Sequence, residues 1–269
     1  MSDPLQNVLA SLGESRKYRD LAPDLLTRIV TSELALNRSE KETIKAVKGA
    51  LHQICGAYFG DAPPFAKWAM ALQESEMSEE ELQIFAMGAM KTHASTRERL
   101  PLLSTFYAHL LREISPIHSV LDLACGLNPL ALSSMPLSPD CRYFATEIHG
   151  GLTDFLEVWF RANKIEGRAI LQDSVIPPAL PPVQIAFVQK FLPVVEQQRK
   201  GASLPFLMAI QAQFLLVTFP TKTLGGKSCG MAGNYSARFL ELISEAPFDL
   251  IEQTRLDTEL CFLLKRDGD

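Results

Sequence analysis

The sequence predicts an α/β fold in which an all-helical N-terminal region, residues 1–112, precedes a seven-stranded sheet domain, residues 113–269. Two observations support this division. In the first region, apolar residues recur with the 3.6-residue period of amphipathic helices. From about residue 117, short apolar runs alternate with helix-length connections, which is the pattern of βαβ units and a parallel sheet.

Five helices are expected in the N-terminal region. In the first, apolar residues within 5–12 share one face at i, i+3, i+4 and i+7 spacing. Two further helix starts have the spacing of a capping box, Ser39 with Glu42 and Ser95 with Glu98. The expected helices are residues 3–15, 22–36, 39–59, 78–95 and 95–114. The acidic stretch "ESEMSEEE" is expected to be a solvated helix start that faces away from any nucleic acid.

Seven apolar runs predict the strands. The first five have helix-length connections, and a helix at 151–164 fits between the second and third. Only Asp257 and Thr258 separate the last two runs, which predicts an antiparallel hairpin. The expected strands are 119–124, 142–148, 168–173, 184–189, 214–219, 248–256 and 259–266. A sheet of this kind is the architecture of the Rossmann-like methyltransferases that use S-adenosylmethionine (SAM).

The stretch "SVLDLACGLNPLAL", residues 119–132, predicts a ligand site. Its strand delivers Ala124, Cys125 and Gly126 to the carboxyl edge of the sheet, where doubly wound folds bind ligands. Small residues at that edge let a ligand approach the backbone. The stretch has one glycine where the dinucleotide fingerprint has three, so a pyrophosphate cradle is not expected.

Two carboxylates follow at the next strand ends. Glu147, 25 residues after Asp122, can accept hydrogen bonds from both ribose hydroxyls of a nucleoside. Asp173 ends the third strand and can accept a hydrogen bond from an adenine amino group. Together these positions suit adenosine without a pyrophosphate, and so SAM. An ordinary strand-turn-helix with surface acids is the alternative that the pattern alone leaves open.

Several longer stretches carry a resemblance to a known family. They are "HASTRERL" (93–100), "LDLACGLNPLAL" (121–132), "LQDS" (171–174), "KFLPVVEQQRKG" (190–201) and "FPTKTLGGKSCGMAGNY" (219–235). They resemble the aminoglycoside-resistance 16S rRNA methyltransferases, and more narrowly the branch that methylates N7 of a guanine in the ribosomal decoding site. "RKYRDLAPD" (16–24) and "LHQICGAYF" (51–59) match the N-terminal part of that family, so the resemblance covers nearly the whole chain.

The resemblance implies a helical region that docks on the 30S subunit and a SAM-binding domain. The implied cofactor residues are Tyr58, His93, Ala94, Ser95, Arg99, Ala124, Gly126, Glu147, Asp173, Ser174, Gln189 and Gln198. Arg99 is expected to pair bidentately with the methionine carboxylate, although by itself it would also fit a helix-surface salt bridge. Many relatives carry Asp in place of Glu147, and the ribose contact is expected to persist with a shifted geometry.

Guanine N7 carries a lone pair and no proton, so no catalytic general base is expected. The enzyme must position N7 against the methyl group and distort the RNA or flip the base. The expected RNA-binding residues are Arg16, Lys17, Arg19, Lys45 and Lys48, with Lys222, Lys227 and Met231 from the glycine-rich loop after the fifth strand. Solvated helix faces and a plain surface loop are the alternatives for these groups.

The bulk properties narrow the possible functions. The net charge of −5 requires that nucleic-acid contacts come from local basic patches. Five scattered cysteines without a CxxC pair predict neither a disulfide framework nor a metal site. No signal peptide or membrane-spanning run is evident, so a cytoplasmic protein is expected. Two other functions stay open: a small-molecule SAM methyltransferase with a helical lid, and an inactive SAM- or RNA-binding protein.

Overall fold

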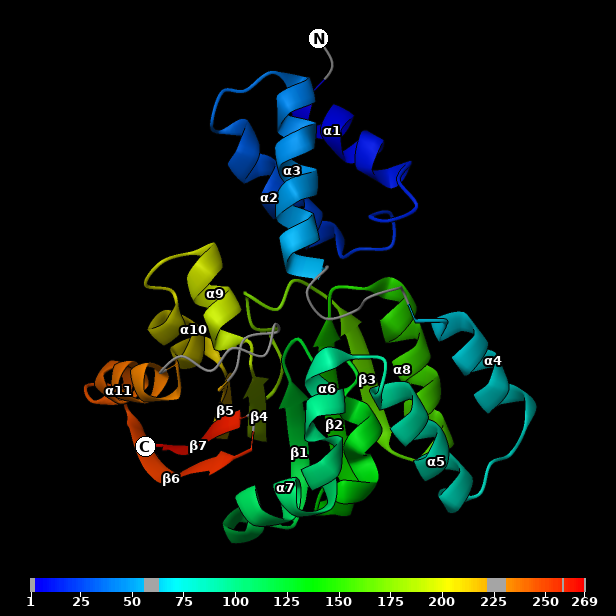
Figure 1. The fold of residues 1–269 in the computed structure, drawn as a ribbon, viewed down its shortest axis with the longest axis vertical. Coiled ribbons are helices and arrows are strands. Elements are labelled where there is room, and N and C mark those ends of the chain that lie inside the picture. Colours follow the sequence, from blue (N-terminus) through cyan, green and yellow to red (C-terminus); the bar gives the residue numbers. More distant parts are fainter. Residues whose placement is uncertain (1–2, 56–62, 222–230, 258, 269) are drawn as a thin grey trace.

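The structure is a computed structural model that describes residues 3–55, 63–221, 231–257 and 259–268. Its centre is a seven-stranded sheet in the order β3-β2-β1-β4-β5-β7-β6, shown in Figure 1. The first five strands in this order, β3, β2, β1, β4 and β5, are parallel. Strand β7 pairs antiparallel with both β5 and β6. The strands are β1 Ile117–Asp122, β2 Leu137–Glu147, β3 Glu166–Leu171, β4 Val183–Gln189, β5 Ala212–Pro220, β6 Phe248–Leu256 and β7 Glu259–Arg266. The predicted fold class and terminal hairpin are therefore confirmed.

Helices precede the sheet and alternate with its strands. The α-helices are α1 Pro4–Gly13, α2 Pro23–Leu34, α3 Glu40–Cys55, α4 Phe65–Glu74, α5 Glu79–Met90, α6 Ala94–Arg99, α7 Leu103–Leu110, α8 Gly150–Ala162, α9 Leu192–Gln198, α10 Ser203–Ala209 and α11 Met231–Ile243. Short 3-10 helices are η1 Leu100–Leu102, η2 Arg112–Ile114 and η3 Asn128–Ser134. In the part of the chain that the structure describes, no helix combines the length and apolar character needed to cross a membrane.

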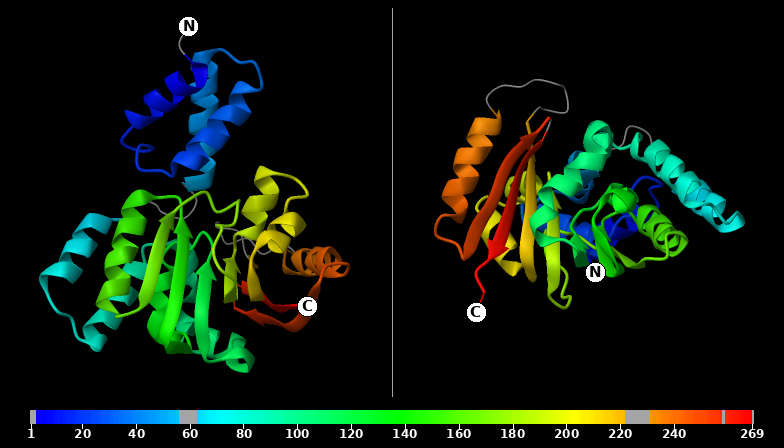
Figure 2. Two further views of the ribbon diagram at one scale, coloured as in Figure 1. Left: turned by 180° about the vertical axis from the view of Figure 1, so that it is seen from behind. Right: turned by 90° about the horizontal axis from the view of Figure 1, so that it is seen from below.

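The sheet has a hydrophobic cluster on each face because successive strand residues point to opposite sides. On one face Val120 and Tyr143 pack with side chains of α5, α7 and α8. On the other face Leu121 and Val188 pack with α9, α10 and α11. Figure 2 shows the sheet on edge with helices on both sides. This three-layer arrangement leaves the carboxyl ends of the parallel strands open to form a site.

Helices α1 to α3 form a cluster of their own that includes Leu12, Leu25 and Leu51. They lie beyond the carboxyl ends of the parallel strands, as Figure 1 shows. Residues 20–22 join this unit to the loop after β2, with hydrogen bonds from the Ala22 N–H to the carbonyl of Ile148 (2.8 Å) and from the Gly150 N–H to that of Asp20 (2.7 Å). Helices α4, α5 and α7 instead contribute to the cluster on the sheet.

One predicted capping box is confirmed and the other is wrong. At the start of α3 the Glu42 carboxylate accepts from the Ser39 N–H at 3.1 Å, and Ser39 Oγ accepts from the Glu42 N–H at 3.4 Å. The helix expected at 95–114 begins one residue earlier, at Ala94, and no side chain caps it. Pro101 ends it as a short 3-10 turn before α7, because proline lacks an N–H and crowds the preceding turn.

The residues just before the family stretch "HASTRERL" form α4 and α5. Ser78 and Glu81 form a capping box there, with the Glu81 carboxylate accepting from the Ser78 N–H at 2.8 Å. Glu79 and Glu80 are exposed in the same first turn, where carboxylates stabilise a helix N-terminus. The solvated helix start expected for this acidic stretch is therefore confirmed.

Candidate cofactor site

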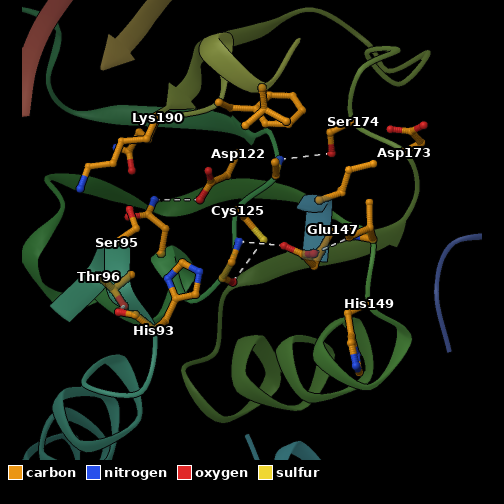
Figure 3. A pocket seen from close by; sticks show the side chains of 18 of the residues that line it. His93, Ser95, Thr96, Asp122, Cys125, Glu147, His149, Asp173, Ser174 and Lys190 are labelled. Atoms are coloured by element: carbon orange, nitrogen blue, oxygen red, sulfur yellow. Dashed lines mark hydrogen bonds between the residues drawn. The ribbon is translucent and has the colours of Figure 1, made fainter. Parts of the chain in front are cut away.

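A pocket lies at the carboxyl ends of β1, β2 and β4 (Figure 3). His93, Ser95 and Lys190 stand at one end of it, and Asp173 and Ser174 stand at the other. Ten of the expected cofactor residues line it: His93, Ser95, Arg99, Ala124, Gly126, Glu147, Asp173, Ser174, Gln189 and Gln198. Ala94 is half-buried next to the pocket without being part of its wall, and Tyr58 lies outside the described residues.

The turn after β1 is held by backbone geometry and by the neighbouring strands. Ala124 has a φ of +50° and Gly126 a φ of +52°, in the left-handed region. The Ala124 N–H donates to Ser174 Oγ at 3.2 Å, which joins this turn to the loop after β3. A Cβ atom on Gly126 would lie 2.9 Å from Cε1 of His93. Glycine is therefore required at 126 both by the backbone angle and by the imidazole packed against it.

Glu147 ties the end of β2 to the same turn. Its two carboxylate oxygens accept from the Gly126 N–H at 3.0 Å and from the Ile148 N–H at 2.8 Å. Burial raises the pKa of this carboxyl, and the backbone hydrogen bonds offset part of that effect. Each carboxylate oxygen can accept a further hydrogen bond. Glu147 can therefore hold the loop and still receive two hydroxyl donors.

Asp173 is held from the N-terminal helical unit. Its backbone N–H donates to Oδ2 of Asp24 at 2.9 Å, and its own Oδ2 accepts from Nε of Arg28 at 2.6 Å. Arg28 also donates to Oε1 of Gln198 on α9. Sequence reasoning missed Asp24 and Arg28 because it followed only the apolar face of α2. Their spacing of four residues, which places both on one side of a helix, was the signal that could have found them.

Arg99 belongs to a buried ionic network below the pocket. Its Nε and Nη2 donate to the two carboxylate oxygens of Glu259, each at 2.9 Å. Its Nη1 donates to Oδ1 of Asn128 and to Oε1 of Gln189, each at 2.7 Å. The bidentate edge of the guanidinium is thus already engaged by the protein. Arg99 is buried, so its alternative reading as a surface residue is wrong. It lines the pocket, and its pairing with a ligand carboxylate stays a prediction.

Lys190 supplies a second cation that sequence reasoning missed. It follows directly after β4 with a φ of +56°, and its Nζ lies 2.6 Å from Glu98 and 3.5 Å from Glu259. Burial alone would raise the pKa of Glu259, but the charges of Arg99 and Lys190 outweigh burial and lower it. The sequence signal that could have identified Lys190 was its position immediately after the end of β4.

Asp122 is the third buried carboxyl group of the site. Its Oδ2 accepts from Nδ2 of Asn128 at 2.8 Å and from the Tyr143 hydroxyl at 2.7 Å. Burial raises its pKa to about 6, against the opposing effect of these hydrogen bonds. Asp122 and Asn128 hold the end of β1 to the short helix η3 that follows the turn.

His93 is neutral at physiological pH. Burial is the main cause that lowers its pKa to about 4, and the nearby charges of Lys190 and Arg99 act in the same direction. A neutral imidazole therefore faces the turn at Gly126 and adds no positive charge to this part of the pocket.

The expected RNA-binding residues divide by their position in the chain. Tyr18 donates from its hydroxyl to the carbonyl of Lys48 at 3.3 Å, so the basic residues within 16–19 lie beside those of α3, Lys45 and Lys48. Arg16, Lys17, Arg19 and Lys45 are exposed there, and Lys48 is half-buried. Lys222 and Lys227 lie outside the described residues; Met231 begins α11, and its side chain is not described.

The fold and the pocket define a class of protein. A seven-stranded sheet with a reversed terminal strand, and carboxylates rather than a glycine-rich loop at the strand ends, is typical of SAM-dependent methyltransferases. The sequence profile of the family "Ribosomal RNA methyltransferase (FmrO)" matches residues 14–263, and the chain belongs to this family.

Individual relatives match over nearly their whole length. A 16S rRNA (guanine(1405)-N(7))-methyltransferase from Serratia marcescens is 35% identical, with 98% of this chain and 99% of the relative covered. A protein of the same name from Frankia casuarinae is 33% identical, over 97% and 94%. The crystal structure of the 16S rRNA methyltransferase RmtF in complex with S-adenosyl-L-homocysteine (SAH) superposes with a TM-score of 0.83 at 32% identity, covering 99% of both chains. The 16S rRNA methylase RmtB gives a TM-score of 0.80 at 31% identity, over 97% and 98%.

Proposed function

We propose that this protein transfers the methyl group of SAM to N7 of guanine 1405 of 16S rRNA in the 30S subunit, and that this confers aminoglycoside resistance. The observation that carries the proposal is the full-length match to relatives named for this reaction, at up to 35% identity. The pocket at the strand ends agrees with it, because its carboxylates suit a nucleoside cofactor. The action on 30S subunits implies a cytoplasmic location.

The donor and acceptor groups of the pocket fit SAM. Glu147 keeps acceptor capacity on both oxygens for the ribose hydroxyls, and Asp173 offers a carboxylate to the adenine amino group. The turn at Ala124 and Gly126 presents backbone without bulk. We place the methionine end toward His93, Ser95 and Lys190, at the opposite end of the pocket from Asp173. When bound, SAM supplies a methyl group on a positively charged sulfur.

The mechanism requires positioning rather than proton transfer. Guanine N7 attacks with its lone pair and has no proton to lose, so the site needs no general base. The protein residues hold the cofactor by its two ends and fix the direction in which the methyl group faces, which is where the rate enhancement arises. His93, which is neutral, places no cation against the positively charged sulfur.

The N-terminal region, residues 1–112, would dock on the 30S subunit, and residues 113–269 would bind SAM together with His93 and Ser95 of the N-terminal region. Arg16, Lys17, Arg19, Lys45 and Lys48 form a basic surface on a chain with a net charge of −5. Contacts from such a surface to phosphates position an enzyme without reading sequence. In this proposal Lys222, Lys227 and Met231 stay predicted RNA contacts of the loop after β5.

Transfer of tritiated methyl groups tests the proposal. We expect incorporation into assembled 30S subunits and little into 50S subunits, which lack 16S rRNA. We also expect little into naked 16S rRNA, because only the assembled subunit would hold the target guanine and the docking phosphates in a fixed arrangement. Asp173→Asn, which removes the carboxylate charge and replaces one of its two acceptor oxygens by a donor, should lower incorporation. If folded protein binds SAH but methylates no RNA, the inactive binding-protein reading replaces this one. Transfer to a small molecule alone would favour the helical-lid reading.

A further inference from the structure

We propose that Arg28 is a positioning residue for the adenine end of the cofactor, acting through Asp173 and Gln198. The inference rests on the proposed function, since it takes Asp173 as the acceptor of the adenine amino group. It gives the N-terminal helical unit, which already lines the pocket with Leu21 and Ile54, a polar role at the adenine end.

Three segments distant in the sequence meet at this point. Arg28 lies on α2, 145 residues before Asp173 and 170 residues before Gln198. Its guanidinium donates from Nε to Oδ2 of Asp173 at 2.6 Å and from Nη2 to Oε1 of Gln198. The side chain of Asp173 is 6% exposed and that of Arg28 is 31% exposed. Arg28 is therefore the cation that compensates a nearly buried carboxylate at the pocket wall.

The hydrogen bonds of Arg28 also determine what the two partners still offer. Asp173 uses Oδ2 for Arg28, and among the described residues its Oδ1 accepts a long contact of 3.4 Å from the Val175 N–H. Gln198 uses its carbonyl oxygen for Arg28, which orients its amide so that the NH₂ group remains as donor. One carboxylate acceptor and one amide donor complement the amino group and a ring nitrogen of adenine.

Helix α2 holds Asp173 by a second contact. Asp24, four residues before Arg28, accepts from the Asp173 N–H at 2.9 Å. The helix thus fixes both the backbone and the carboxylate of Asp173. Because α2 also packs against α3, which carries Lys45 and Lys48, the adenine contact is built onto the unit that carries the basic surface.

Calorimetry with two nucleosides tests this role. SAH carries the adenine amino group, and S-inosylhomocysteine carries a carbonyl in its place. We expect the wild-type protein to prefer SAH. Arg28→Ala should weaken SAH binding about tenfold or more, because Asp173 and Gln198 are no longer held in place. A loss of that size is comparable to that of one charge-assisted hydrogen bond. It should also reduce the preference for SAH over the inosyl compound, which a merely structural role would not do.

Two further variants sharpen the test. Arg28→Lys keeps the charge but lacks the planar guanidinium whose Nε and Nη2 donate to the two partners, so it should restore SAH binding only in part. Arg38→Ala is the matched control, because Arg38 lies between α2 and α3 and pairs with Glu33 at the surface. Its SAH affinity and nucleoside preference should equal those of the wild type. Thermal unfolding should show that each measured variant is folded.

The results separate this inference from the function on which it rests. Wild-type protein that fails to bind SAH overturns both. Wild-type binding with unchanged or tighter binding by Arg28→Ala overturns only the role of Arg28, as does an unchanged preference between the two nucleosides. In the double variant Arg28→Ala/Asp173→Asn, the loss of SAH affinity should be smaller than the sum of the single losses, because both substitutions disrupt one contact. Full additivity would also contradict the proposal.

Discussion

Arg99 and Glu259, 160 residues apart, form a bidentate ion pair below the pocket, with both hydrogen bonds at 2.9 Å. Each side chain is only 2% exposed. Lys190 approaches the same carboxylate, and Thr218 donates to it at 2.8 Å from β5. These ion pairs therefore connect α6 and the loop after β4 to β7, the last strand in the chain.

Glu259→Ala should destabilise the fold strongly because it leaves two buried cations short of a counter-charge. Breaking a buried pair in this way costs about 3–5 kcal/mol. Urea unfolding should show a loss of that size, with a smaller loss for Glu259→Gln, which keeps the shape. The control is Glu113→Ala, which removes a surface pair with Arg112 and should cost about 0–1 kcal/mol. Equal stability of Glu259→Ala and the control would contradict the structural role of this network.

Arg99→Ala should be destabilised for the same reason, since it leaves the Glu259 carboxylate buried without its main partner. Loss of methyl transfer in this variant will therefore reflect the fold as well as the pocket.

The buried imidazole of His93 should make stability depend on pH. Its folded pKa of about 4 lies below the unfolded value of about 6.5, so the unfolded chain binds the extra proton between these values. Its contribution is fully present above pH 6.5 and is lost as pH falls toward 4, by about 3 kcal/mol in total. Asp122 has a raised pKa of about 6, so its contribution to stability falls as pH rises between about 4 and 6. This opposite trend masks much of the pH dependence that His93 causes in the wild-type protein.

The difference in unfolding free energy between wild type and His93→Gln, measured from pH 4 to 7, gives the contribution of His93 alone, because Asp122 is present in both proteins. We expect the wild-type protein to gain stability relative to the variant as pH rises through this window. A constant difference between the two proteins would show that His93 titrates normally in the folded state.

Lys17→Glu and Arg19→Glu should weaken binding to 30S subunits without changing SAH affinity. Both side chains are exposed on the N-terminal unit, and Lys17 lies 3.1 Å from His52 of α3. Each reversal should lower affinity by about tenfold at low salt, and the salt dependence should become shallower because fewer counterions are released. Filter binding across salt concentrations measures both effects.

Lys265→Glu is the control for this charge reversal. Lys265 is exposed near the end of β7, at the opposite edge of the sheet from the basic surface. It should bind 30S subunits like the wild type. Identical affinities for all three variants would place the docking surface elsewhere.

Expression in a susceptible bacterium should give resistance to gentamicin- and kanamycin-type aminoglycosides but not to apramycin. N7 methylation adds bulk and a positive charge where a cationic drug contacts the guanine. Losing about 3 kcal/mol of drug affinity corresponds to a rise of roughly a hundredfold in the inhibitory concentration. Equal resistance to apramycin would indicate methylation of a different base, and no resistance despite good expression would favour a small-molecule substrate.

The fold and the strand-end residues could be predicted because their signals are local. Apolar runs with turn residues between them mark each strand, and parallel strands bring Gly126, Glu147 and Asp173 to one edge. The helix expected at 95–114 ignored Pro101, although proline interrupts a helical pattern at a known position and the structure breaks the helix there.

The partners of those residues could not be predicted in the same way. Arg28 with Asp173 and Arg99 with Glu259 are separated by 145 and 160 residues, and no periodic pattern connects them. Their pairing depends on how α2 and β7 pack against the pocket. The sequence therefore located the groups that face a ligand better than the groups that hold them.

The most direct test of the central claim is the position of the methyl group on the RNA. N7-methylguanosine carries a positive charge that makes its ring reducible by borohydride, after which aniline cleaves the chain at that base. 16S rRNA from 30S subunits treated with this protein and SAM should show one new cleavage, at guanine 1405, by primer extension. Methyl incorporation without cleavage there, or with cleavage at another base, would contradict the account.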